Sequence, residues 1–257
     1  CLELKEALAG HLAIQSGSGR SDSLRTISFD NILVGNGSTE IIHLLARAWL
    51  LSNAGGPVPA AFILTPTYGE YAGACGIQKA PIFSQDAGPP PDFRWDLDRA
   101  AQTIESRRPA LVFLCNPNNP TGAVADGDFF ERVVAFAQRY NVPVLHDAPY
   151  TEVAYDGYKP MSFLETPGAK EVGMEFHSLS KSYNMTGWRI GMAVGNAEMI
   201  NALMRVKSNL DSGIPQAIQI AGIEALTGPQ DCIPEHNTIY QRRRDQLVAA
   251  LQDIGLQ

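Results

Sequence analysis

Lys181 lies in a segment whose side chains could bind an aldehyde and a phosphate together. Ser178 and Ser180 precede it, and Arg189 follows eight residues later. A lysine that is desolvated near a cationic group has a lowered pKa, so its neutral amine can form an imine with an aldehyde. Guanidinium groups bind phosphate through paired hydrogen bonds, and hydroxyl groups can add further ones. These residue types therefore predict a covalent site for a phosphorylated aldehyde.

A lone lysine is ordinarily a solvated surface charge. Lys181 differs because Gly187, Trp188 and Gly191 follow it closely and imply tight packing. For the other five lysines we expect the ordinary surface role: Lys5, Lys79, Lys159, Lys170 and Lys207.

Two polar clusters directly follow apolar segments. Asp147 and Tyr150 come after 142–146, and a run rich in Asn and Pro that contains Asn119 comes after 110–114. By themselves such residues are typical of turns. Asp147 stands 34 residues before Lys181, and that spacing gives the pair more weight than either residue has alone.

A glycine-rich turn opens the first long helical pattern. Gly37, Ser38 and Thr39 lie where free backbone N–H groups and the helix dipole favour a phosphate. Ser38 could serve instead, or also, as the helix N-cap. Tyr68 and Tyr71 follow the apolar segment 60–64; aromatic residues there usually pack, and we expect Tyr71 to be a core residue.

Apolar segments alternate with helical patterns along the whole chain. The predicted strands are 60–64, 110–114, 142–146, 173–177 and 191–195, and the predicted helices are 2–14, 38–52, 97–107, 126–140, 197–208, 215–227 and 235–253. We expect surface loops at 53–59 and 86–91. This alternation predicts one α/β domain, a three-layer α/β/α arrangement around a mostly parallel sheet. Ligands of such sheets bind at the carboxyl ends of the strands.

The segment from Ser178 to Gly191 resembles the signature of class I/II aminotransferases with the type I pyridoxal-phosphate fold. The resemblance implies that Lys181 carries pyridoxal 5'-phosphate as a Schiff base. It also implies that Arg189, Ser178 and Ser180 bind the cofactor, with Arg189 on its phosphate.

The same resemblance assigns the remaining site residues. Asp147 would pair with the protonated pyridine nitrogen, which keeps the ring an electron sink. Asn119 and Tyr150 would donate to the phenolate oxygen, and Tyr68 would stack on the ring. The phosphate would also contact Gly37, Ser38 and Thr39. Lys181, Asp147 and Tyr68 are the predicted catalytic residues.

The resemblance implies transamination from an amino acid to a 2-oxo acid such as 2-oxoglutarate, by a homodimer. Residues 1–257 would be the cofactor-binding large domain, with the N-terminal arm and the C-terminal small domain of complete members largely absent. From Ala123 onward the chain is similar to LL-diaminopimelate aminotransferases, which suggests LL-diaminopimelate as donor and a role in lysine biosynthesis. The first half resembles histidinol-phosphate aminotransferases.

Composition excludes several other classes of function. The net charge of −7 argues against nucleic acid or an anionic membrane as partner, and no apolar stretch approaches the roughly 18 residues that span a bilayer. The cysteines form no CxxC pair, which favours a reducing cytoplasm, and Cys115 should be a buried free thiol. The histidines lack metal-ligand spacing; we expect no metal and structural roles for His146 and His177.

Two alternatives remain open at this stage. A pyridoxal-phosphate decarboxylase or lyase on the same fold would use the same Lys181 but break a different bond at Cα. A ligand-sensing, catalytically incomplete aminotransferase-like domain would keep the fold without the reaction.

Overall fold

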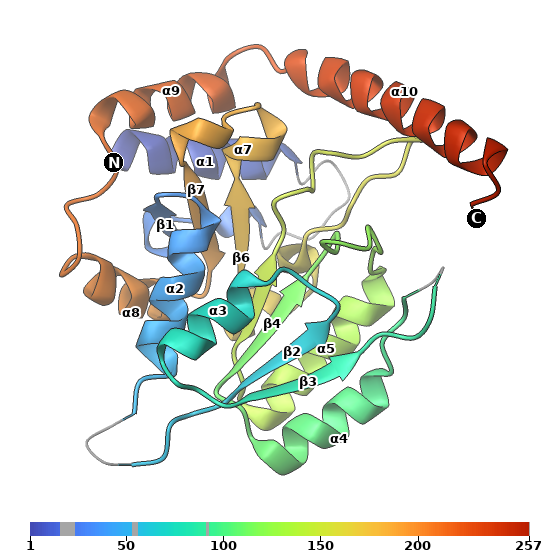
Figure 1. Cartoon of the computed structure of the whole chain (residues 1–257). Helices are drawn as coiled ribbons and strands as arrows, with labels where there is room; N and C mark the ends of the chain where they lie inside the picture. The colour runs from blue at the N-terminus through green and yellow to red at the C-terminus, as the bar shows by residue number, and fades with distance from the viewer. Residues whose placement is uncertain (16–23, 53–55, 91–92, 257) are drawn as a thin grey trace.

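The protein is described from a computed structural model that covers residues 1–15, 24–52, 56–90 and 93–256. Residues 53–55 and 91 of the two predicted loops lie outside this description. A seven-stranded sheet runs through the centre, with the strand order β1-β7-β6-β5-β4-β2-β3 (Figure 1).

The five strands β3, β2, β4, β5 and β6 pair in parallel, while β7 is antiparallel to both of its neighbours, β6 and β1. This confirms the mostly parallel sheet. The strand bounds are β1 Ile32–Gly35, β2 Ala61–Thr65, β3 Ile82–Asp86, β4 Leu111–Cys115, β5 Val144–Asp147, β6 Gly173–Ser178 and β7 Gly191–Gly195.

Helices follow most of the strands, as the alternating pattern predicts. Their bounds are α1 Leu2–Gln15, α2 Ser38–Trp49, α3 Glu70–Ile77, α4 Leu97–Arg107, α5 Gly127–Tyr140, α6 Ala169–Val172, α7 Leu179–Ser182, α8 Ala197–Lys207, α9 Gln216–Thr227 and α10 Cys232–Asp253. Short 3-10 turns lie at Leu24–Thr26, Phe29–Asn31, Phe163–Glu165 and Thr186–Trp188.

Both faces of the sheet are buried, and each carries its own apolar core. Along β2, Phe62 and Leu64 belong to the core under α1, α4, α5 and α9, whereas Ala61 and Ile63 belong to the core under α2, α3 and α8. Side chains alternate between the faces of a strand, so a strand buried on both sides is apolar throughout. The three-layer α/β/α arrangement is confirmed.

Five of the described strands and α-helices were not predicted from the sequence: β1, β3, α3 and the four-residue helices α6 and α7. β1 has only four residues and leads almost directly into α2, so it is hard to separate from the helix. β3 lies at the sheet edge, and of its five residues only Gln85 is buried, so it lacks an apolar signal. α3 has eight residues, three of which are Gly or Cys, and no amphipathic pattern.

The long helix α10 contributes little to either core. None of its residues is buried, and Leu247, Val248 and Leu251 are exposed. Figure 1 shows it extending along one side of the molecule. Within the described ranges no helix has both the length and the hydropathy needed to cross a membrane.

Candidate active site

Ten of the eleven predicted site residues line one cavity of about 230 Å³ at the carboxyl ends of β4, β5 and β6. They come from six separate segments of the chain: Ser38, Thr39, Tyr68, Asn119, Asp147, Tyr150, Ser178, Ser180, Lys181 and Arg189. A larger cavity of about 320 Å³ lies beneath α4 and α5; its lining is mostly apolar and includes none of these residues.

Lys181 is placed by the short helix α7, which begins where β6 ends. The Ser178 side chain accepts a hydrogen bond from the Ser180 N–H at 3.3 Å and so caps the turn. Lys181 Nζ lies 5.5 Å from the centre of the Tyr150 ring. The Ser180 hydroxyl is buried and has no hydrogen-bond partner among the described residues, so it remains available to a ligand.

Arg189 lines the same cavity and follows the 3-10 turn Thr186–Trp188. Its backbone is left-handed, with φ of 55°, and its Nη1 donates to the Thr186 carbonyl at 3.2 Å. The guanidinium lies against Gly37, the eleventh predicted residue, so closely that a Cβ there would collide with it. Gly37 itself has φ of 86°, a conformation that glycine adopts readily.

Tight packing after Lys181 is confirmed for Gly191 and was wrong for Gly187 and Trp188. A Cβ on Gly191 would lie 2.6 Å from the Ser38 nitrogen, so β7 touches the turn before α2. In contrast, Gly187 has no atom within 4 Å of its Cβ position, and Trp188 is 49% exposed. Both belong to a 3-10 turn that bulges out between α7 and β7.

Asp147 is a buried carboxylate with one oxygen paired and one oxygen open. Its Oδ2 accepts a 2.7 Å hydrogen bond from the Tyr71 hydroxyl, whereas Oδ1 has no partner in the described structure. Burial raises the pKa of Asp147 to about 6, although Tyr71, His146 and His177 act to lower it. A buried carboxylate with a free oxygen suits a cationic N–H group.

Tyr71 is a functional residue that the sequence analysis missed. It is fully buried, as expected of a core residue, and it stacks on Phe113 at 4.9 Å, but its hydroxyl orients Asp147. Tyr68 packs edge-on against it at 5.8 Å. No local pattern signals this role, because Tyr71 and Asp147 stand 76 residues apart in the chain.

Asn119 and Tyr150 meet in the lining of the cavity. Asn119 Nδ2 donates to the Tyr150 hydroxyl at 3.3 Å, so both groups point at the same place. Burial and the nearby Cys115 and Asp147 raise the pKa of Tyr150. Cys115 is a buried free thiol, as expected, and burial followed by Asp147 raises its pKa to about 11.

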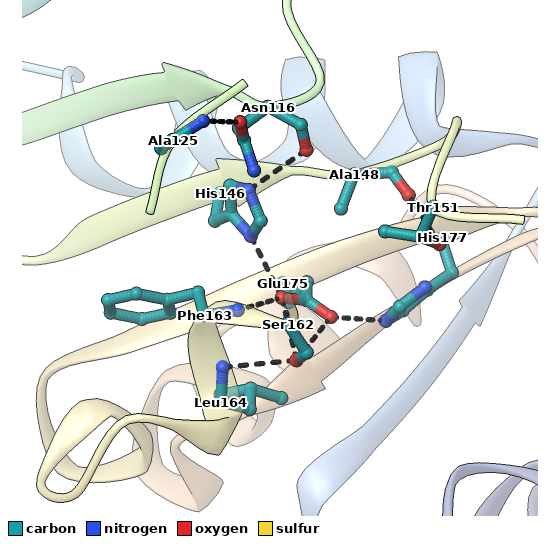
Figure 2. Close-up of polar contacts among 10 residues, drawn as sticks. All are labelled: Asn116, Ala125, His146, Ala148, Thr151, Ser162, Phe163, Leu164, Glu175 and His177. Carbon is teal, nitrogen blue, oxygen red and sulfur yellow. Dashed lines mark hydrogen bonds and ion pairs between the residues drawn. The ribbon is translucent and has the colours of Figure 1, made fainter. Parts of the chain in front are cut away.

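A buried ionic network links β5 and β6 to the segment that begins at Ser162 (Figure 2). The Glu175 carboxylate lies 2.8 Å from His146 Nδ1 and 2.8 Å from His177 Nε2, and it accepts from the Phe163 N–H at 2.8 Å. Burial alone would raise the pKa of Glu175, but the two histidines hold it well below its ordinary range. Glu175 in turn raises the pKa of His177 against the effect of burial.

The lining fits pyridoxal phosphate. Ser38, Thr39 and Arg189 could hold a phosphate at the start of α2, and Asp147 Oδ1 could pair with a ring nitrogen. Lys181 lines the same cavity and offers an amine for an aldehyde. Across the ranges that the structure describes, no group of three or more His, Cys, Asp or Glu side chains could hold a metal ion.

Comparisons with known proteins agree with this geometry. The family model "Aminotransferase class I and II" matches residues 2–257. LL-diaminopimelate aminotransferase of Dehalococcoides mccartyi is 50% identical over 229 residues, which are 86% of this chain and 58% of that relative. The enzyme of the same name from Moorella thermoacetica is 58% identical over 150 residues, covering 58% of this chain and 38% of its own length.

Solved structures give the same result for the fold. Aspartate aminotransferase from Thermus thermophilus with maleate superposes with a TM-score of 0.87 at 27% identity, over 99% of this chain and 63% of that one. The present chain therefore spans about three fifths of the length of the Dehalococcoides mccartyi relative and of the Thermus thermophilus structure. With the family model matching residues 2–257 and the type I fold shared with its neighbours, the chain belongs to the class I and II aminotransferase family.

Proposed function

We propose that this protein is a pyridoxal-phosphate-dependent aminotransferase, with Lys181 as the residue that binds the cofactor covalently. One observation carries the proposal: Lys181 and the buried Asp147, whose Oδ1 is unpaired, line the same cavity as Arg189. Pyridoxal phosphate, when bound, withdraws electrons from the substrate bond that breaks.

The protein's own residues would act at the ring, at the phosphate and at the substrate. Asp147 holds the ring nitrogen protonated, and Tyr68 holds the plane of the ring. Asn119 and Tyr150 donate to its phenolate oxygen. Arg189, Gly37, Ser38, Thr39, Ser178 and Ser180 hold the phosphate end in place. The Lys181 amine would move the proton at the substrate Cα.

We propose LL-diaminopimelate as the amino donor and a 2-oxo acid such as 2-oxoglutarate as the acceptor. The support is the similarity to enzymes named LL-diaminopimelate aminotransferase, which extends over 86% of the chain and so beyond its second half. Such a reaction belongs to lysine biosynthesis. A panel of donors, with glutamate, aspartate and histidinol phosphate beside LL-diaminopimelate, tests it on the full-length gene product.

Further proposals concern the assembly. Residues 1–257 would form the cofactor-binding large domain, and the full-length protein would act in the cytoplasm as a homodimer, as the family resemblance implies. The four cysteines are free thiols, which suits a reducing compartment. Light scattering on the full-length protein measures the oligomeric state, and a monomeric mass with full activity would contradict the dimer.

The absorbance spectrum tests the central proposal. Added pyridoxal phosphate should give a protein-dependent band near the visible edge that borohydride traps, and Lys181→Ala should abolish the band. Lys159→Ala is the matched control, because Lys159 is an exposed lysine outside the cavity. A band that survives in Lys181→Ala, or is missing from the wild type, would overturn the assignment.

A further inference from the structure

Lys207 is not the solvated surface lysine that its sequence context predicts. It is 4% exposed and lies at the end of α8, where its Nζ donates to Glu40 Oε2 at 2.8 Å and to Asp211 Oδ2 at 2.7 Å. Burial alone would lower the pKa of Lys207, but these two carboxylates raise it, so the side chain is a cation at neutral pH. Removing a charge from water costs free energy, so the buried position of Lys207 needs an explanation.

Glu40, the residue that Lys207 holds, shapes the turn before α2. Glu40 Oε2 accepts from the Asn36 N–H at 2.7 Å, and Oε1 accepts from the Asn36 side-chain amide at 2.9 Å. The carboxylate lies so close to the chain that a Cβ on Gly35 would be 2.7 Å from Oε2. A glutamate in the first helical turn that bonds backward in this way fixes how the chain enters the helix.

That turn forms part of the proposed phosphate cradle. The residue after Asn36 is Gly37, which touches the Arg189 guanidinium, and Ser38 and Thr39 follow in the cavity wall. Lys207 does not line the cavity itself. Contacts therefore run without a break from Lys207 through Glu40 and Asn36 to the groups that face the phosphate.

Charge gives Lys207 a second effect. Glu40 places a carboxylate in the first turn of α2, the same helix end that would receive the phosphate dianion. An unpaired carboxylate there would repel that ligand, and Lys207 supplies the counter-charge. The effect should be confined to the phosphate end, because Lys207 contacts none of the residues assigned to the ring.

We propose that Lys207 is a positioning residue that, through Glu40, holds the turn Asn36–Gly37 in its phosphate-binding form and offsets the Glu40 charge. The proposal rests on the proposed cofactor site. Lys207 should therefore affect how tightly the phosphate group of the ligand binds and leave binding of the ring unchanged.

The test compares two ligands that differ only in the phosphate, pyridoxal phosphate and pyridoxal. Dissociation constants are measured by absorbance titration of cofactor-free wild type, Lys207→Met, Lys207→Arg and Arg205→Met. Arg205 is the matched control, because it is an exposed cation on the same helix two residues away. Lys207→Met should weaken pyridoxal phosphate by at least about tenfold, as expected when a binding group loses its support. Pyridoxal affinity should change less than about twofold. Lys207→Arg should keep most of the wild-type affinity for pyridoxal phosphate, and Arg205→Met should bind both ligands as the wild type does.

Equal weakening of both ligands would show a merely structural role and overturn the inference, and so would unchanged affinity for both. Adding Glu40→Gln to Lys207→Met should recover part of the lost affinity, since it removes the uncompensated carboxylate. If circular dichroism shows that Lys207→Met does not fold, Lys207→Gln carries the same expectation. A wild type that binds neither ligand would overturn the proposed function first, and the inference with it.

Discussion

At the scale of single residues, the site depends on how each polar side chain is supported. Asp147 has a single hydrogen-bonded oxygen, and the donor is Tyr71, a residue buried in the core under α2 and α3. Lys181 owes its place to a capped turn at the end of β6. The chemistry of the cavity is thus set by neighbours that do not all face it.

Tyr71→Phe should weaken pyridoxal phosphate and shift the pH dependence of binding. Binding needs ionised Asp147, so in the wild type it falls as the pH drops through the Asp147 pKa of about 6. Losing a donor to a charged group costs about 1.5–3 kcal/mol and raises that pKa, so the midpoint should move to higher pH. Absorbance titration from pH 5 to 9 measures it. Tyr158→Phe, at an exposed tyrosine, is the control; an unmoved midpoint would contradict the role of Tyr71.

Asp147→Asn should make the cofactor-free protein more stable while impairing cofactor binding. The folded-state pKa of Asp147 is raised from 3.8 to about 6, so between these values the folded state binds more protons than the unfolded chain. Wild-type stability therefore falls as pH rises through this window, by about 3 kcal/mol in all.

Urea denaturation at pH 8 should accordingly show Asp147→Asn as the more stable protein, with the difference shrinking from pH 6 toward pH 4. Asp253→Asn, at an exposed carboxylate, should show no such difference. If Asp147→Asn were no more stable than wild type at pH 8, ionisation of the buried Asp147 carboxyl would not destabilise the fold as expected.

At the scale of elements, the site is assembled where β7 presses on the turn that leads from β1 to α2. This contact joins the Arg189 segment to the phosphate turn, because Gly191 opens β7 and Gly37 ends the turn. Only a glycine at position 191 allows the two backbones to approach so closely.

Gly191→Ala should weaken pyridoxal phosphate by at least about tenfold and lower stability by about 1–3 kcal/mol. The added methyl would lie 2.6 Å from Ser38 N and 2.7 Å from the Gly37 carbonyl carbon, and both are backbone atoms. Gly187→Ala serves as control, because its Cβ position is open. Cofactor titration and thermal melting measure both effects. Similar results for the two variants would refute the steric argument.

At the scale of the whole molecule, two apolar cores on opposite faces of the sheet hold the fold together, and one ionic network ties β5 and β6 to the segment at 162–165. Glu175 accepts from the Ser162 side chain and the Phe163 backbone and faces both histidines. α10 adds no buried residue to either core, and polar contacts such as the ion pair of Arg244 with Asp156 join it to the rest of the structure.

Glu175→Gln should lower the free energy of unfolding by about 3 kcal/mol, because it leaves buried partners without their counter-charge. Because the folded-state pKa of Glu175 is lowered, its ionised form stabilises the fold above pH 4.5. This contribution is lost as the pH falls from 4.5 through the lowered pKa. Because the folded-state pKa of His177 is raised, its charged form stabilises the fold fully below pH 6.5. This contribution is lost as the pH rises through the raised pKa. The deficit of the variant should be largest between these values in urea denaturation. Glu171→Gln, an exposed neighbour, should stay within about 0.5 kcal/mol. A deficit that does not vary with pH would contradict the ionic role.

Strong periodic segments and the signature motifs could be read from the sequence alone. The predicted helix 97–107 and strand 191–195 match α4 and β7 residue for residue, since their apolar spacing and end signals are clear. The eleven site residues were named from the resemblance of their motifs to the aminotransferase signature, and ten of them line one cavity at the carboxyl ends of neighbouring strands.

Only the tertiary structure identified the residues that hold the site residues in place. Tyr71 looks like a core aromatic, and Lys207 like a surface cation, until folding brings the first within 2.7 Å of Asp147 and the second within 2.8 Å of Glu40. These pairs are 76 and 167 residues apart in the chain. Local periodicity reflects only residues that are near each other along the chain. It therefore cannot predict contacts between residues so far apart in the sequence. The residues that line the cavity were therefore predictable, and the residues that hold them in place were not.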